Sequence, residues 1–295
     1  MTGIGREGLR AGFFSLLTEN DIEQIHEGAL RVLTRTGIIV HHESVLSLLE
    51  KAGCRVLGDE RRVYIPAPVV EQAVAQAPGE VHLYTRCGEQ AMALGAGPLH
   101  MRTSSGATGV IDLDSGRRRE PTSQDASDAA RLADALPHVH GASTMAVQPA
   151  DQPVSAVDVH AVKIALTNTV KPLGYVCLNE SLIEPVLDML AVAVGGERAL
   201  RHRPIITALA ESTSPLQLLS SQMSVLQAFA ERGLPLTLHA HPMAGLTAPV
   251  TLGGELVITH AEILTLVTIA QLIRPGAPVV YGMSSSVPDM RGGTN

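Results

Sequence analysis

Five short apolar runs, separated by longer segments with helical patterns, occupy the chain from about residue 120 to residue 295. Near-continuous apolar strands that alternate with helices are typical of parallel β/α units, in which helices cover both faces of the sheet. This alternation predicts an α/β fold. The apolar runs span residues 141–148, 172–178, 204–210, 235–240 and 278–283, and the helical segments span 154–167, 181–194, 214–232 and 255–273.

The segment 214–232 carries helix signals at both ends. Ser214 is a favoured N-cap residue, Pro215 suits the first turn, and Gly233 suits the left-handed conformation past the last turn. These signals predict a helix that begins at Ser214, almost directly after the apolar run 204–210.

The first 115 residues mix short helices with short strands. Thr18 and Asp21 are spaced to form a capping box at the start of a helix over 19–36, which Gly37 would end. This rhythm predicts an α+β appendage over residues 1–115, followed by the β/α region over 116–295. Within the appendage we expect further helices over 43–52 and 66–76, and strands over 38–40, 55–57, 63–65, 81–84 and 99–112.

Composition excludes several classes of function. The net charge is −7, and the only basic cluster is Arg117-Arg118-Arg119, which argues against a nucleic-acid partner. The three cysteines have no CxxC spacing, which indicates a reduced, cytoplasmic protein. Polar residues interrupt the longest apolar stretches, 185–194 and 256–273, so we expect soluble helices there and no membrane partner.

Polar side chains gather at the ends of the predicted strands. Alternation places Thr237, His239 and His241 on one face of their strand, opposite the leucines. Glu211 and Gln148 end two other apolar runs. A (β/α)8 barrel uses the C-terminal ends of its strands for chemistry. A doubly wound sheet does so too, but the chain has neither GxGxxG after a strand nor GxxxxGK[ST].

The predicted barrel is incomplete. A closed (β/α)8 barrel needs eight strands, and the chain supplies about five before residues 291–295, which look like the middle of a loop. We therefore expect a TIM-type barrel, truncated at its C-terminus.

The candidate site residues each have more than one interpretation. Glu211 is a carboxylate that could face a substrate cation, or a glutamate stabilised near a helix start. His239 and His241 form an HxH pattern that suits pocket groups, metal ligands or simple interior histidines. Tyr281 offers a cation–π face or a packed ring with a bonded hydroxyl.

Several stretches of the chain resemble the trimethylamine methyltransferase family, whose members act on corrinoid proteins. The C-terminal block carries the most specific likeness, with ESTSPLQ, the segment that begins HPMAGLTAPVTLGGELVITHAEI, and SSSVPDMRGG. The similar stretches are residues 17–38, 63–78, 112–139, 169–174, 211–217, 241–282 and 284–293.

This resemblance implies a methyltransferase that moves a methyl group from a tertiary or quaternary methylated amine, such as trimethylamine or a glycine-betaine-like compound, to cobalt. It implies a corrinoid supplied by a partner protein, no tightly bound cofactor and no metal, and we expect a homo-oligomer at full length. We assign catalytic roles to Glu211, His239 and His241. Substrate-binding roles fall to Tyr281, Met283, Ser284, Ser285, Gln148, Asp289 and Arg291.

Two alternatives stay open. A metal-dependent TIM-barrel hydrolase could use His239 and His241 as ligands. A truncated and inactive relative of the family would have unpaired strand edges and no activity of its own.

Overall fold

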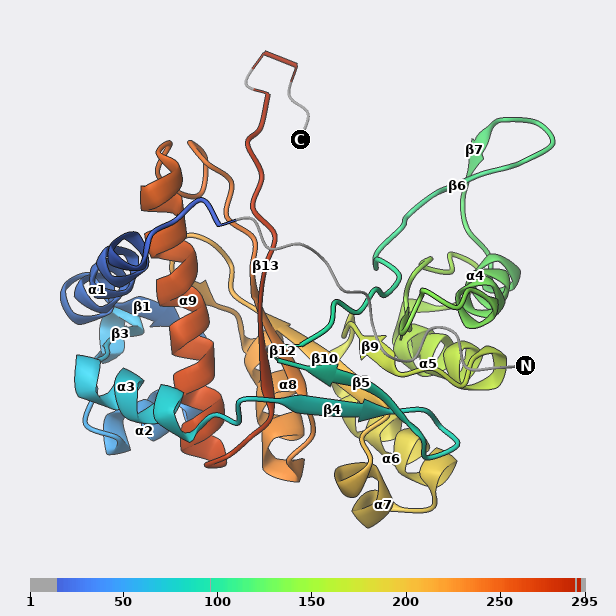
Figure 1. Cartoon of the computed structure of the whole chain (residues 1–295), viewed down its shortest axis with the longest axis horizontal. Coiled ribbons are helices and arrows are strands. Elements are labelled where there is room, and N and C mark those ends of the chain that lie inside the picture. Colours follow the sequence, from blue (N-terminus) through green and yellow to red (C-terminus); the bar gives the residue numbers. More distant parts are fainter. Residues whose placement is uncertain (1–14, 96, 290, 293–295) are drawn as a thin grey trace. The chain divides into compact units, whose positions relative to one another are not determined.

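The computed structural model describes residues 15–95, 97–289 and 291–292 (Figure 1). The described residues divide into two compact units, one within residues 79–209 and the other within residues 15–78 and 210–292. These units are not the regions expected from sequence, and the division into an appendage over 1–115 and a barrel over 116–295 stays a prediction.

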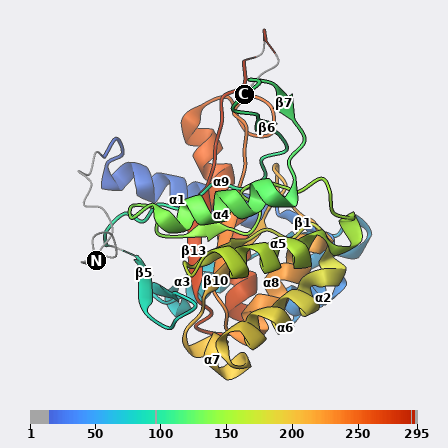
Figure 2. The same cartoon turned by 90° about the vertical axis from the view of Figure 1, so that its right-hand side faces the viewer.

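The unit that contains residues 79–209 is built of short strands and a row of helices. Helix α4 contacts α5, and α5 contacts α6, so the three lie side by side (Figure 2). Strands β8, β9 and β10 pair in parallel. The elements are β4 (Val81–Tyr84), β5 (Gln90–Leu94), β6 (Val110–Ile111), β7 (Arg118–Arg119), α4 (Ser123–Ala135), β8 (Ala142–Ser143), η2 (Val154–Ala156), α5 (Val157–Asn168), β9 (Leu173–Tyr175), η3 (Glu180–Leu182), α6 (Ile183–Val194), α7 (Glu197–His202) and the start of β10 (Ile206–Glu211).

The other unit surrounds one long helix, α9. Its small sheet has the order β11-β1-β3-β2, and its strands β12 and β13 pair in parallel. The elements are α1 (Glu19–Arg35), β1 (Ile38–Val40), α2 (Glu43–Lys51), β2 (Arg55–Leu57), η1 (Gly58–Glu60), β3 (Arg62–Tyr64), α3 (Ala67–Gln76), the end of β10, β11 (Gln217–Leu218), α8 (Ser220–Arg232), β12 (Leu236–Ala240), α9 (Leu252–Ile273) and β13 (Val279–Met283).

The five apolar runs form one sheet of order β13-β12-β10-β9-β8. The pairs β8–β9, β9–β10 and β12–β13 are parallel, and each predicted run overlaps one strand of the sheet. The predicted α/β class is therefore confirmed. Closure of this sheet into a (β/α)8 barrel stays a prediction.

The N-terminal elements also follow the sequence signals. The Thr18 side chain accepts from the Asp21 N–H while Asp21 accepts from the Thr18 N–H, which is the predicted capping box of α1. The strand predicted over 99–112 is wrong, because within it only Val110–Ile111 is a strand. Other residues of this segment make isolated bridges, such as Arg102 with Gly141. The sequence signals also did not predict strand β5.

Helix α8 begins six residues later than its N-cap signal predicts. The Ser214 hydroxyl donates to Glu262 Oε2 at 2.8 Å, so it caps no helix. The chain then forms β11, which pairs with β1, before α8 starts at Ser220. The prediction that Glu211 directly precedes a helix is therefore wrong, whereas Gly233 ends α8 at φ 66° as predicted.

Helix α9 is the core helix of its unit. Among the described residues it is the one helix long and apolar enough to cross a membrane, yet most of its apolar stretch is buried inside the protein. It contacts α1, α2, α3, α8, β12 and β13. A helix that is apolar around its whole circumference needs such cover on several sides. Its buried polar residues are three threonines together with Glu255, Glu262 and Gln271.

The two faces of β12 differ as the alternation predicts. Leu236, Leu238 and Ala240 are fully buried, and the strand contacts α8 and α9. His239 is half-buried, and His241, just past the strand, is exposed. The apolar face therefore holds the strand in place and leaves the polar face for a ligand.

The substitution Leu238→Ala should lower the free energy of unfolding by about 2–5 kcal/mol, because it leaves a cavity under α8 and α9. Urea denaturation followed by circular dichroism measures the change. The matched control is Val250→Ala, whose side chain is 78% exposed and whose removal should matter by less than about 0.5 kcal/mol. Equal effects of the two substitutions would contradict the assignment of the buried face.

Candidate functional site

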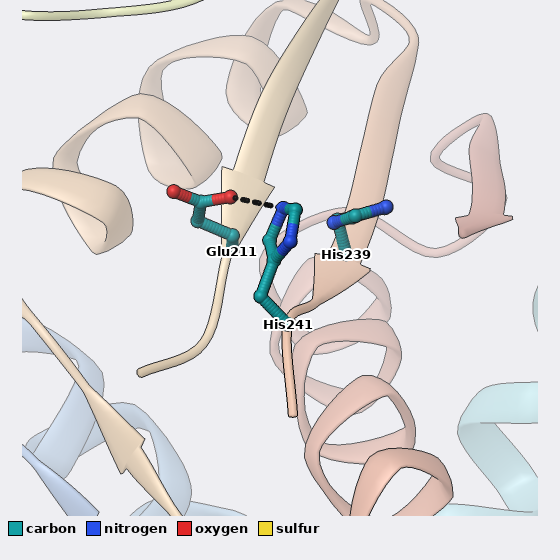
Figure 3. A group of neighbouring side chains, drawn as sticks. All are labelled: Glu211, His239 and His241. Atoms are coloured by element: carbon teal, nitrogen blue, oxygen red, sulfur yellow. Dashed lines mark ion pairs between the residues drawn. The ribbon is translucent and has the colours of Figure 1, made fainter. Parts of the chain in front are cut away.

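Glu211, His239 and His241 converge at the C-terminal ends of two neighbouring strands (Figure 3). Glu211 is the last residue of β10, His239 lies in β12, and His241 follows it. His241 Nε2 lies 3.3 Å from Glu211 Oε2, and the two imidazole rings are 4.2 Å apart. One ligand-type atom from each residue lies within 4.8 Å of the others. We call these three residues the Glu–His–His cluster.

The cluster is open on one side. Relative side-chain exposure is 52% for His241 and 33% for Glu211, whereas His239 is half-buried. The rings of the two histidines lie next to each other, His239 near the end of β12 and His241 one residue past the strand. A small molecule can therefore reach a carboxylate and an imidazole at once, a pairing suited to binding charge and moving protons.

Neighbouring groups fix the backbone of the cluster. The Glu211 N–H donates to Gln222 Oε1 at 3.1 Å, and the Ser212 N–H donates to the His239 carbonyl at 3.0 Å. Ser284 Oγ lies 3.4 Å from His239 Nε2. Gly282 is the register partner of His239, and a Cβ there would come within 2.8 Å of His239 Cδ2. The imidazole therefore lies directly against a position that has no side chain.

The carboxylate of Glu262 holds the segment that follows Glu211. It is fully buried in α9 and accepts from Ser212 Oγ at 2.6 Å and Ser214 Oγ at 2.8 Å. Its other oxygen accepts from the Leu216 N–H at 2.7 Å. Buried carboxylates need such donors. Sequence reasoning missed this residue, although an acidic residue inside the apolar stretch 256–273 was the available signal.

Tyr281 lies on the other face of the sheet from His239 and so does not share a pocket with the cluster. It is the register partner of Leu238, so it shares the strand face opposite His239. Its hydroxyl lies 3.0 Å from His260 Nδ1, and His260 Nε2 lies 2.9 Å from His26 Nδ1. Burial and the neighbouring His26 lower the pKa of His260 to about 4.

The remaining predicted residues are spread over the structure. Ser284 contacts His239, whereas Met283 is the register partner of Ala240 and shares its face. Ser285, Asp289 and Arg291 follow β13, and the Arg291 N–H donates to Asp289 Oδ1 at 2.9 Å. Gln148 belongs to the other unit, where its N–H donates to the Ala107 carbonyl. Substrate-binding roles for these residues stay predictions.

The substitution Glu262→Gln should lower the free energy of unfolding by about 1–3 kcal/mol, because one of the two oxygens that accept from the three donors becomes an amide nitrogen, which cannot accept. Chemical denaturation measures the loss. Glu71→Gln, at an exposed position of α3, is the control and should change stability by less than about 0.5 kcal/mol. A Glu262→Gln protein as stable as the control would show that the carboxylate does not hold this segment.

His260 should make stability depend on pH between its ordinary pKa near 6.5 and its folded value of about 4. The folded state favours the neutral ring, so this contribution is present above pH 6.5 and is lost as the pH falls through 4. Melting temperatures at pH 7, 5.5 and 4 should therefore fall less steeply in His260→Gln than in the unsubstituted chain. Parallel profiles would contradict the lowered pKa.

Comparison with known proteins places the chain in a family. The trimethylamine methyltransferase (MTTB) family profile matches residues 8–295. A glycine betaine methyltransferase of Desulfitobacterium hafniense strain Y51 is 30% identical over 281 residues, which is 95% of this chain and 58% of that protein. The trimethylamine methyltransferase MttB of D. hafniense strain DSM 10664 / DCB-2 is 30% identical over 290 residues, 98% of this chain and 58% of that protein.

The monomethylamine methyltransferase (MtmB) of Methanosarcina barkeri, a solved structure, aligns with a TM-score of 0.44 and 10% identity over 96% of this chain and 69% of that one, a likeness too low to assign the fold. The chain spans 58% of the length of the two Desulfitobacterium relatives. The resemblance carried by its motifs is confirmed, and the chain belongs to the trimethylamine methyltransferase family.

Proposed function

We propose that the protein to which this chain belongs transfers a methyl group from a tertiary or quaternary methylated amine to the cobalt of a corrinoid protein. The observation that carries this proposal is the Glu–His–His cluster, which joins a carboxylate and two imidazoles at the ends of neighbouring parallel strands. The family and the names of its relatives support methyl transfer from trimethylamine or glycine betaine.

Glu211 is suited to attract the cationic nitrogen of such an amine. The nitrogen loses its charge as the C–N bond breaks, so a full negative charge in contact with it would favour the bound substrate over the transition state. His241 Nε2 lies 3.3 Å from Glu211 Oε2, so one carboxylate oxygen already faces the imidazole and is not fully available to the amine. The pair can therefore orient the amine without holding its cation too firmly.

The openness of the cluster fits a methyl acceptor that arrives on another protein. A corrinoid supplies a reduced cobalt that acts as a strong nucleophile, and its approach needs an accessible site. The 52% exposure of His241 leaves room for such an approach. His239, held between Gly282 and Ser284, would line the inner wall that orients the substrate.

The proposal also covers the fold, the assembly and the location of the full-length protein. We place the five parallel strands in a TIM-type barrel that closes in the full-length protein, which we expect to be a cytoplasmic homo-oligomer. The burial of the long apolar helix α9 within its unit supports a cytoplasmic location.

Full-length protein mixed with a reduced corrinoid protein should produce the methyl–cobalt absorption spectrum when trimethylamine or glycine betaine is added. Glu211→Gln should slow this reaction by at least about tenfold, because it removes the charge that attracts the amine. Glu71→Gln is the control and should react at the unsubstituted rate. No methyl–cobalt spectrum with any methylated amine in a broad panel would refute the proposal.

A further inference from the structure

We propose that the Glu–His–His cluster is a binding site for a divalent transition metal of the zinc type. The donor set is two imidazoles and one carboxylate, which matches zinc sites that keep a position open for a ligand. This inference deepens the proposed function, on which its substrate consequence rests, but metal binding itself can be measured without any methyl transfer.

The spacing of the donors suits one small cation. Ligands about 2.0–2.1 Å from a tetrahedral zinc lie about 3.3 Å from one another. His241 Nε2 and Glu211 Oε2 are already 3.3 Å apart, and the ligand-type atoms of all three residues lie within 4.8 Å of one another. One of the three pairs is therefore already at the spacing of zinc ligands, and the other two lie within about 1.5 Å of it.

The surroundings favour a formed site over a chance meeting of surface groups. His239 lies in β12, His241 directly follows that strand, and Glu211 ends the adjacent strand, so the sheet positions the backbone of all three residues. Glu262 fixes the segment after Glu211, and Gly282 leaves room for the His239 ring. Outer contacts of this kind orient metal ligands and raise affinity.

A bound ion would reverse the charge of the cluster. The Glu211 carboxylate contributes −1 and a divalent ion +2, so a site whose two imidazoles act as metal ligands carries about +1. In the metal-loaded site Glu211 would bind the ion and would no longer attract the amine nitrogen. An amine that also bears a carboxylate would instead be held by that carboxylate at the open position, whereas a simple methylammonium ion would be repelled. The metal-loaded site would therefore select zwitterionic methylated amines.

The test uses the present chain, freed of metal with a chelator and titrated with Co²⁺ and then Zn²⁺. We expect one equivalent to bind, with the visible d–d spectrum of tetrahedral or five-coordinate Co²⁺, and Zn²⁺ to displace it. His241→Ala and Glu211→Gln, at accessible positions, should each weaken Zn²⁺ binding by at least about tenfold.

His202→Ala, at an exposed position in α7, is the control and should bind as the unsubstituted chain does. Melting curves of all variants establish that they are folded. No saturable binding, or equal affinity in the cluster variants and the control, would overturn the metal site.

Glycine betaine in excess should change the Co²⁺ spectrum, whereas tetramethylammonium should not. A spectrum unchanged by glycine betaine would overturn the carboxylate-binding part of the proposal. If the cluster binds metal but the full-length protein transfers no methyl group, the proposed function is refuted and the metal site is retained. If the protein transfers methyl groups but the cluster binds no metal, the metal site is refuted and the proposed function is retained.

Discussion

One buried carboxylate, that of Glu262, connects the core of its unit to the candidate site. Removing a carboxylate from water is costly unless strong donors replace the lost hydration. Here two hydroxyls and one backbone N–H do so, and all three come from the short segment that follows Glu211. The position of the cluster carboxylate therefore depends on a core helix, not on loop packing alone.

Helix α9 reaches two regions of the unit from nearly opposite sides. Residues 260 and 262 are two positions apart, about 200° around the helix axis. Glu262 faces the segment after β10, whereas His260 contacts Tyr281 of β13 and His26 of α1. This explains why polar residues interrupt a helix whose composition is otherwise that of a fully buried core.

The sequence predicted most of the elements, because local signals determine them. The capping box of α1 and the alternation in β12 depend on residues a few positions apart, and both are confirmed. The alternation also placed His239 and His241 on one face. The face on which Tyr281 lies could not be predicted, because it depends on the register between β12 and β13, which no local pattern specifies.

Long-range partners account for the other differences. Ser214 is a residue type that often caps helices, but its hydroxyl donates to the carboxylate of Glu262, 48 residues later in the chain. The role of Glu262 could not be predicted either, because its three donors lie 46 to 50 residues earlier in the chain. The segment 99–112 was predicted as one strand, yet before Val110 it pairs with its neighbours only through isolated bridges. Local propensity is overridden wherever a tertiary contact offers a better partner.

The bare backbone at Gly282 limits how this site can be altered by engineering or by drift. Any larger residue there would collide with the His239 ring, so the observed orientation of the imidazole requires glycine at position 282. Mutant libraries that seek a new amine preference should therefore keep Gly282 and vary Ser284, whose exposed hydroxyl lies 3.4 Å from the same ring.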